Sequence, residues 1–102
     1  MTCTVQKHSF PIMNRKFFVY IVRCRDGSLY IGVTNRLAAR MRRHNEYQGA
    51  EWVKQRGGGR VVYAETCDSY AQAYRREKQL KKWSRAKKEA LIQGDRELLK
   101  TL

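Results

Sequence analysis

Two apolar segments joined by one tight turn constrain the fold of this chain more than any other part of its sequence. Residues 17–24 (FFVYIVRC) and 28–34 (SLYIGVT) flank the tripeptide Arg25, Asp26 and Gly27. A glycine that follows an aspartate between segments rich in β-branched residues is a strong hairpin signal. The segments therefore predict two antiparallel strands that pair side by side.

The length of the turn decides which side chains share a face of this hairpin. A two-residue turn would mix polar and apolar side chains on both faces, whereas a three-residue turn with Gly27 in the left-handed region pairs Cys24 with Ser28. Alternation along the strands then gives one apolar face, which we assign to the core: Val19, Ile21, Leu29, Ile31 and Val33. The opposite face carries Tyr20, Val22, Tyr30 and Gly32, and we expect the glycine to leave that surface open.

Caps and apolar spacing predict the remaining elements. Thr34 or Asn35 can cap a helix with a narrow apolar stripe, and residues 60–65 (RVVYAE) predict a third strand. Turn-rich residues with several glycines separate these two elements and limit any helix between them to about residues 50–56.

Two further helices have recognisable ends. Ser69 and Gln72 resemble a capping box that opens a helix running to about residue 82, and Ser84 and Gly94 bracket a last helix. The predicted class is α+β, with a small three-stranded antiparallel sheet flanked by helices in the order β-β-α-β-α-α.

A chain of 102 residues has room for one ordinary domain with one modest core. We expect a loosely held N-terminal tail over residues 1–15, which contain the only proline and show no sustained period. Residues 16–93 form the predicted domain, and residues 94–102 form a C-terminal extension.

The charge of the chain indicates the class of its partner. Lysines and arginines number 22 against 9 aspartates and glutamates, which gives a net charge of +13. Such an excess favours a polyanion such as nucleic acid, and a membrane surface is the weaker alternative because no basic amphipathic anchor is present. No feature indicates an obligate protein partner.

The cysteines indicate the redox compartment. Cys3, Cys24 and Cys67 are odd in number and contain no Cys-x-x-Cys pair. We therefore expect reduced thiols in a cytoplasmic protein, associated with the nucleoid if its partner is DNA.

One acidic residue interrupts an apolar helix stripe. Glu77 shares a side of the predicted helix with Tyr70, Ala73, Tyr74, Leu80 and Lys81. Burying a carboxylate without a partner costs several kcal/mol, so Glu77 needs compensation. A buried ion pair with an arginine and a bound metal ion are the two alternatives.

Basic residues gather on two predicted helices. Arg40 and His44 are four residues apart and stack on one face of the helix after the hairpin. Lys81, Lys82 and Arg85 make a later basic segment that is suited to following a nucleic-acid backbone. A solvated surface is the structural alternative for each of these cations, and His44 can also be a favourable cation at a helix end.

These residues together resemble a known family. Val19-Tyr20 followed by Tyr30-Ile31-Gly32 is similar to the two-part signature of the GIY-YIG nuclease superfamily. Arg40 and His44 follow Tyr30 at the family's spacing, and Glu77 stands at its metal-binding position. The chain resembles the small single-domain bacterial members from residue 17 to about residue 92.

The resemblance implies a chemistry for the site. It implies a divalent ion, Mg²⁺ or Mn²⁺, held by Glu77 with water ligands. It implies Arg40 as a phosphate clamp beside His44, and Tyr20 or Tyr30 as the general base. A free tyrosine titrates near pH ~10, so this role requires adjacent positive charge. Candidate nucleic-acid contacts are Gly32, Arg36, Arg43, Lys81, Lys82 and Arg85.

The implied function is a weak or structure-selective DNA endonuclease, of the kind used in DNA repair or recombination. Two departures from the family pattern bear on it: Phe18 replaces the first motif's glycine, and no asparagine follows Asn45. The main alternative is a non-catalytic module that binds DNA or RNA on the same fold. A ribosome-associated structural protein would explain the charge but leaves the site residues unexplained.

Overall fold

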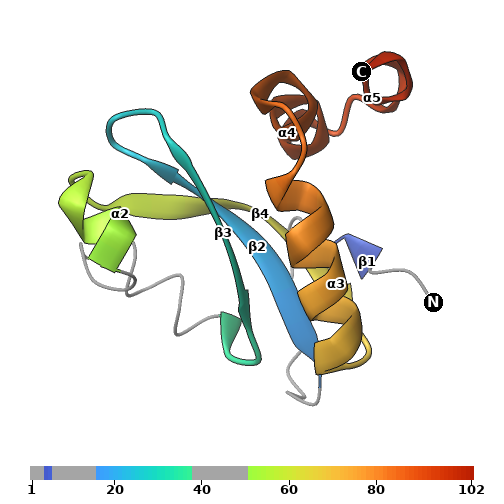
Figure 1. Cartoon of the computed structure of the whole chain (residues 1–102), viewed down its shortest axis with the longest axis horizontal. Helices are drawn as coiled ribbons and strands as arrows, with labels where there is room; N and C mark the ends of the chain where they lie inside the picture. Colours follow the sequence, from blue (N-terminus) through green and yellow to red (C-terminus); the bar gives the residue numbers. More distant parts are fainter. Residues whose placement is uncertain (1–3, 6–15, 38–50) are drawn as a thin grey trace.

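The computed structural model describes residues 4–5, 16–37 and 51–102. The elements of these residues are β1 (Thr4–Val5), β2 (Phe17–Cys24), β3 (Leu29–Thr34), α2 (Glu51–Gln55), β4 (Gly59–Cys67), α3 (Tyr70–Lys81), α4 (Arg85–Gln93) and α5 (Arg96–Thr101). All strands pair antiparallel in the order β1-β4-β2-β3, and α3 lies along one face of the sheet (Figure 1). The predicted α+β class with its three main antiparallel strands is confirmed.

The sheet also gains a short fourth strand from the segment that we expected to be a tail. In β1, Thr4 pairs with Thr66 and Val5 pairs with Glu65. This part of the predicted tail is therefore an edge strand of the domain.

The β2–β3 hairpin has the predicted turn and register. The Cys24 amide donates to the Ser28 carbonyl oxygen at 2.8 Å, and the Gly27 amide donates to the Cys24 carbonyl oxygen at 2.9 Å. Gly27 has a φ of 90°, which the three-residue turn requires and which glycine adopts without strain. Tyr20 lies opposite Gly32, as alternation predicted.

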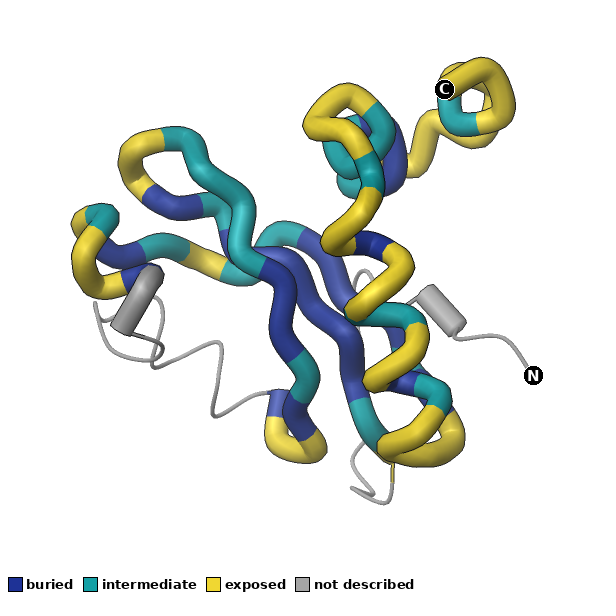
Figure 2. Tube along the Cα trace, in the orientation of Figure 1, coloured by how far each residue is buried: buried dark blue, intermediate teal, exposed yellow. Residues whose placement is uncertain are grey.

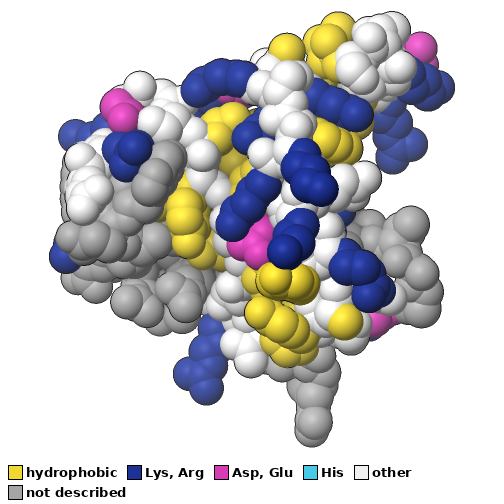
Figure 3. Space-filling model, viewed as in Figure 1, with side chains coloured by type: hydrophobic (Ala, Val, Ile, Leu, Met, Phe, Trp, Pro, Cys, Tyr) yellow, Lys and Arg dark blue, Asp and Glu magenta, His cyan; other side chains and the backbone are white. Residues whose placement is uncertain are grey.

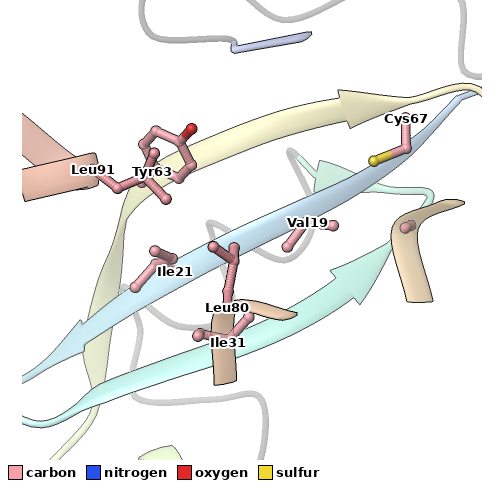
Figure 4. Packing of buried hydrophobic residues seen from close by; sticks show 8 residues of the cluster. Val19, Ile21, Ile31, Tyr63, Cys67, Leu80 and Leu91 are labelled. Atoms are coloured by element: carbon pink, nitrogen blue, oxygen red, sulfur yellow. The ribbon is translucent and has the colours of Figure 1, made fainter. Parts of the chain in front are cut away.

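One face of the sheet packs under α3. The buried residues of this first core are Val19, Ile21, Ile31, Tyr63, Cys67, Ala73, Leu80 and Leu91, with Leu29 and Val33 packed against them. In Figure 4, Leu80 of α3 lies between strand residues such as Ile21 and Ile31. The predicted core face of the hairpin is confirmed.

The opposite face is buried as well. A second core of Phe18, Tyr20, Val22, Cys24, Leu37, Val53 and Ala64 covers it, and Tyr30 and Val61 pack against this core. In Figure 2 the central residues of β2 are coloured as buried. The expectation of an open surface beside Gly32 is wrong, because α2 and the residues after β3 supply apolar side chains to this face.

A β-bulge in β4 divides its side chains between the two cores. Ile21 pairs with Tyr63, but the next residue, Val22, pairs with Val61, so Val62 is the extra residue. Without the bulge, Val61 would share the face of Tyr63. The bulge instead places Val61 in the second core and leaves Tyr63 under α3.

The helix caps are those that the sequence predicted. Ser69 Oγ accepts from the Gln72 amide at 3.2 Å, and Gln72 Oε1 accepts from the Asp68 amide at 3.1 Å. Ser84 caps α4, and Gly94 ends it with a φ of 73°. Beyond the prediction, β4 is longer than residues 60–65, and the C-terminal extension forms α5.

The cysteines differ from the prediction. Cys24 is a free, buried thiol, and burial raises its pKa. Cys67 is fully buried and disulfide-bonded. The expectation of reduced thiols is therefore wrong for Cys67, since an odd count without Cys-x-x-Cys does not exclude a bond between distant segments.

Candidate active site

The hairpin brings two of the predicted site residues together. The rings of Tyr20 and Tyr30 lie on the same face of adjacent strands, with centroids 6.4 Å apart and planes inclined by 50°. Tyr20 is buried, with 2% of its surface exposed, whereas Tyr30 is half-buried. Of the two phenols, Tyr30 is therefore the one with access to solvent.

Gly32 allows Tyr20 to lie flat against β3. A Cβ atom at Gly32 would lie 2.6 Å from Tyr20 Oη and 2.7 Å from its Cζ, closer than non-bonded atoms approach. Gly32 is itself buried. The glycine of the second motif thus makes room for the tyrosine of the first.

Glu77 lies on α3, between two residues of that helix that pack in the first core. Ala73 and Leu80, four residues before and three after it, are fully buried. The Glu77 side chain itself is 17% exposed, and its Oε2 lies 3.2 Å from Lys81 Nζ. Of the two alternatives that the sequence left open, a buried pair with an arginine does not form within the described residues, where Glu77 reaches the surface and pairs with Lys81 one turn along.

The tyrosines and Glu77 approach β3 from its two sides. Ile21 and Ile31 face α3, so the intervening Tyr20 and Tyr30 face away from that helix. However, β3 is an edge strand of the sheet. A ligand that lies against its outer side can therefore be reached from both faces of the sheet. In Figure 3, acidic atoms over α3 are surrounded by Lys and Arg atoms, beside a strip of exposed hydrophobic atoms.

The remaining predicted catalytic residues, Arg40 and His44, lie outside the described residues, as does Arg43. The entry to their segment is described. Thr34 Oγ1 accepts from the Arg36 amide at 3.0 Å, as a capping residue does, and Leu37 packs in the same core as Tyr20. The chain that carries Arg40 therefore leaves β3 on the tyrosine side of the sheet.

Few side chains could bind a metal ion together in the part of the chain that the structure describes. No group of three His, Cys, Asp or Glu side chains converges there. Mg²⁺ is often held by one or two carboxylates, with water and substrate phosphate oxygens completing its octahedron. Glu77 fits such a site, provided that nucleic acid and water supply the other ligands.

The predicted basic contacts form a surface along α3 and α4. Lys81, Lys82 and Arg85 are exposed and adjacent in sequence, and Arg36 is exposed near the end of β3. Arg85 and Lys88 line a pocket of about 380 Å³ whose other wall is the hairpin turn at Asp26–Leu29. Arg85 is partly neutralised, because one of its guanidinium nitrogens lies 3.1 Å from Glu89.

A buried ion pair that sequence reasoning missed anchors α3 to β4. Glu65, almost fully buried, accepts from Arg76 Nε at 2.9 Å and Arg76 NH2 at 2.8 Å, and from the Tyr63 hydroxyl at 2.6 Å. Burial opposes the charge of Arg76, but its hydrogen bonds to Glu65 outweigh this and raise its pKa. Burial and the hydrogen bond to Glu65 raise the pKa of Tyr63 far above its usual range.

A second ion pair attaches α4 to the end of β2. Arg23 donates to both carboxylate oxygens of Glu89, at 2.7 and 2.6 Å. These bonds hold the pKa of Glu89 below its usual value and raise that of Arg23. The sequence did contain a signal for this pair. Arg23 lies on the predicted core face of its strand, and a charged residue there requires a partner of opposite charge.

Known proteins share these features. A family model described as the GIY-YIG catalytic domain matches residues 16–90. A UPF0213 protein from Staphylococcus saprophyticus is 43% identical over 77 residues, 76% of this chain and 94% of that protein. A UPF0213 protein from Staphylococcus aureus is 44% identical over 75 residues, 74% of this chain and 92% of that one.

A solved structure also matches. The solution NMR structure of a UPF0213 protein from Bacillus halodurans superposes with a TM-score of 0.50 at 37% identity, and covers 76% of this chain and 83% of that one. The matched family region begins just before the hairpin and spans the tyrosine pair and Glu77.

Proposed function

The chain belongs to the GIY-YIG catalytic domain family, and from this membership we propose that it is a divalent-metal-dependent endonuclease that hydrolyses phosphodiester bonds in DNA. The observation that carries the proposal is the packing of Tyr20 over Gly32 beside Tyr30, which gives the two motifs one physical purpose. Structure-selective cleavage, in DNA repair or recombination near the nucleoid, is the role that we assign to it.

The two tyrosines have different tasks in this proposal. Tyr30 is half-buried and can contact an attacking water, so it is the general base. Tyr20 is too deeply buried to exchange protons with solvent, and it holds the Tyr30 ring in position from the neighbouring strand. Arg40, which lies outside the described residues, is the proposed clamp on the scissile phosphate and favours the ionised phenol, and His44 follows it four residues later in the sequence.

Glu77 is the proposed metal ligand. A bound Mg²⁺ or Mn²⁺ supplies positive charge to the phosphate and to the leaving oxygen. Lys81 neutralises the Glu77 carboxylate in the structure, and because its side chain is 56% exposed, this surface pair is weak and can exchange for another partner. A phosphate group that attracts Lys81 frees Glu77, so nucleic-acid binding and metal binding favour each other.

The basic surface provides the remaining affinity. Lys82 and Arg85 contact phosphates along α3 and α4, and Arg36 does so near the end of β3. Arg43, outside the described residues, is a further proposed phosphate contact. Among the described residues, no helix is long and apolar enough to cross a membrane. Independently of this, the net charge of +13 favours nucleic acid as the partner.

The Glu77–Lys81 pair also supports a second candidate function. An acid that is already neutralised by a lysine needs no metal ion, as expected of a module that binds DNA or RNA without cutting it. The two candidates differ in their requirement for Glu77.

Nicking of supercoiled plasmid and of branched DNA, in Mg²⁺ or Mn²⁺ and in chelator, tests the proposal. We expect metal-dependent nicking that falls by at least about a hundredfold in Glu77→Ala, because a metal ion stabilises transition-state charge by several kcal/mol. Glu97→Ala, which removes an exposed carboxylate from α5, is the matched control and should cut normally. Binding without cutting by the parent protein on every substrate would instead establish the non-catalytic module.

A further inference from the structure

An exposed row of aromatic rings crosses the start of α3. Tyr70 is 56% exposed and Tyr74 is 42% exposed, and their rings stack with centroids 6.0 Å apart and planes inclined by 25°. Phe17, at the start of β2, meets Tyr70 edge-on at 5.6 Å. Phe17 thus supports the base of the row, while both tyrosine side chains remain exposed.

A cation completes the row. Lys78 Nζ lies 4.9 Å from the centroid of the Tyr74 ring, one turn further along α3. Exposed hydrophobic atoms and neighbouring Lys and Arg atoms gather over α3 in Figure 3.

The core does not require these two rings. Ala73 and Leu80 are the residues of α3 that are fully buried against the sheet. An exposed aromatic pair adds little to helix stability, and tyrosines that keep 56% and 42% of their surface exposed gain only part of the free energy of burial. The pair is therefore available for a ligand with flat, stackable groups.

We propose that Tyr70 and Tyr74 stack on unpaired bases of a single-stranded nucleic-acid segment, while Lys78 contacts its phosphates. Base stacking on aromatic side chains beside a cationic track is the common means of binding single strands, and it tolerates any sequence. The net charge of +13 complements such a partner, whereas the paired bases of a duplex do not offer their flat faces.

The position of the pair gives it a role at the proposed site. Glu77 is three residues beyond Tyr74 and therefore lies about 4.5 Å further along the helix axis on the same side. An unpaired strand stacked on the tyrosines is thus directed toward Glu77. This step rests on the proposed function, and it specifies the substrate as DNA with an unpaired strand next to the cut.

Binding of a fluorescein-labelled oligothymidylate and of a duplex of equal length, measured by anisotropy in chelator, tests the inference without any cleavage. The variant Tyr70→Leu/Tyr74→Leu should bind the single strand about tenfold more weakly, as expected for the loss of one or two stacked bases, and should bind the duplex as the parent does. Tyr70→Phe/Tyr74→Phe keeps both rings and should retain single-strand affinity.

Leu98→Ala is the control for removing an exposed apolar side chain, from α5, and should change neither affinity. Equal weakening on single strand and duplex, or no weakening on either, would overturn the inference. Because the assay contains no metal ion, a protein that fails to cut DNA can still confirm it. Conversely, metal-dependent cutting that the leucine variant performs equally well on branched and single-stranded DNA would leave the proposed function intact and refute the stacking role.

Discussion

The contact between the two signature motifs makes Gly32→Ala the most informative single change. The added Cβ would lie 2.6 Å from Tyr20 Oη, 2.7 Å from Cζ and 3.0 Å from Cε2. Carbon atoms in contact prefer a separation of roughly 3.5–4.0 Å, so the ring must move by about 1 Å. Tyr20 is packed in the second core and cannot move without disturbing Val22 and Val53.

Overpacking of this kind costs about 1–3 kcal/mol, partly offset by the ~0.4–1 kcal/mol that replacing glycine gains from the unfolded state. We expect Gly32→Ala to lower the free energy of unfolding by about 1–2 kcal/mol in urea titrations. For a domain of this size the melting temperature should fall by roughly 4–8 °C per kcal/mol.

A double-mutant cycle separates the clash from a general effect of alanine in β3. Tyr20→Phe removes only the hydroxyl and leaves the ring carbons in contact, so it should restore little. Tyr20→Leu removes the ring, and in that background Gly32→Ala should cost almost nothing, giving a coupling energy of about 1–2 kcal/mol. If Gly32→Ala destabilises both backgrounds equally, the reasoning that links the two motifs through this contact is refuted.

Three further changes test other parts of the structure. Arg76→Met should lower the free energy of unfolding by about 3–5 kcal/mol, because it leaves the Glu65 carboxylate buried without its arginine partner. The control Arg75→Met changes an exposed side chain and should change the free energy of unfolding by less than about 0.5 kcal/mol. Urea titration measures both. The folded-state pKa of Glu89 lies below its unfolded value of 4.5, so its ion pair stabilises the protein above that pH, and this contribution is lost as the pH falls through the lower folded pKa. Glu89→Gln should therefore reduce the loss of stability between neutral and acidic pH, as followed by urea titration across that range. Tyr30→Phe should reduce nicking by roughly 10²- to 10⁴-fold with unchanged DNA affinity, since it removes the general base and keeps the ring.

Local chemistry explains which parts of the fold could be predicted. The hairpin turn and the helix caps depend on hydrogen bonds between residues only a few positions apart in the sequence. The structure contains the predicted turn and the predicted caps at Ser69, Ser84 and Gly94. The second core depends on Leu37 and Val53, which come from other segments, and it was missed. A signal existed, because residues 17–22 are apolar at every position, a pattern typical of a strand that is buried on both faces.

The candidate site divides in the same way. The pairing of Tyr20 with Gly32 followed from the register and is confirmed, but the burial of Tyr20 did not follow from alternation alone. The sequence left a buried ion pair and a bound metal ion as the alternatives at Glu77, whereas the carboxylate that forms a buried ion pair with α3 in the described structure is Glu65, on β4. The partner of Glu65 is eleven residues away, and its reach depends on how α3 crosses β4, which no local pattern specifies.

The order of the sheet explains how residues on its two faces can serve one reaction. With β3 at the edge, a phosphate that lies against its outer side can be approached from the tyrosine face and from α3 at once. If β3 were a central strand, Tyr30 and Glu77 would be separated by a continuous sheet, and no single phosphate could contact both. The short strand β1 lengthens the sheet at the opposite edge, beside β4, and among the described strands none pairs with the outer side of β3, which carries the second motif. The proposed mechanism is thus compatible with burial of both faces of β2, because it uses only the edge of β3.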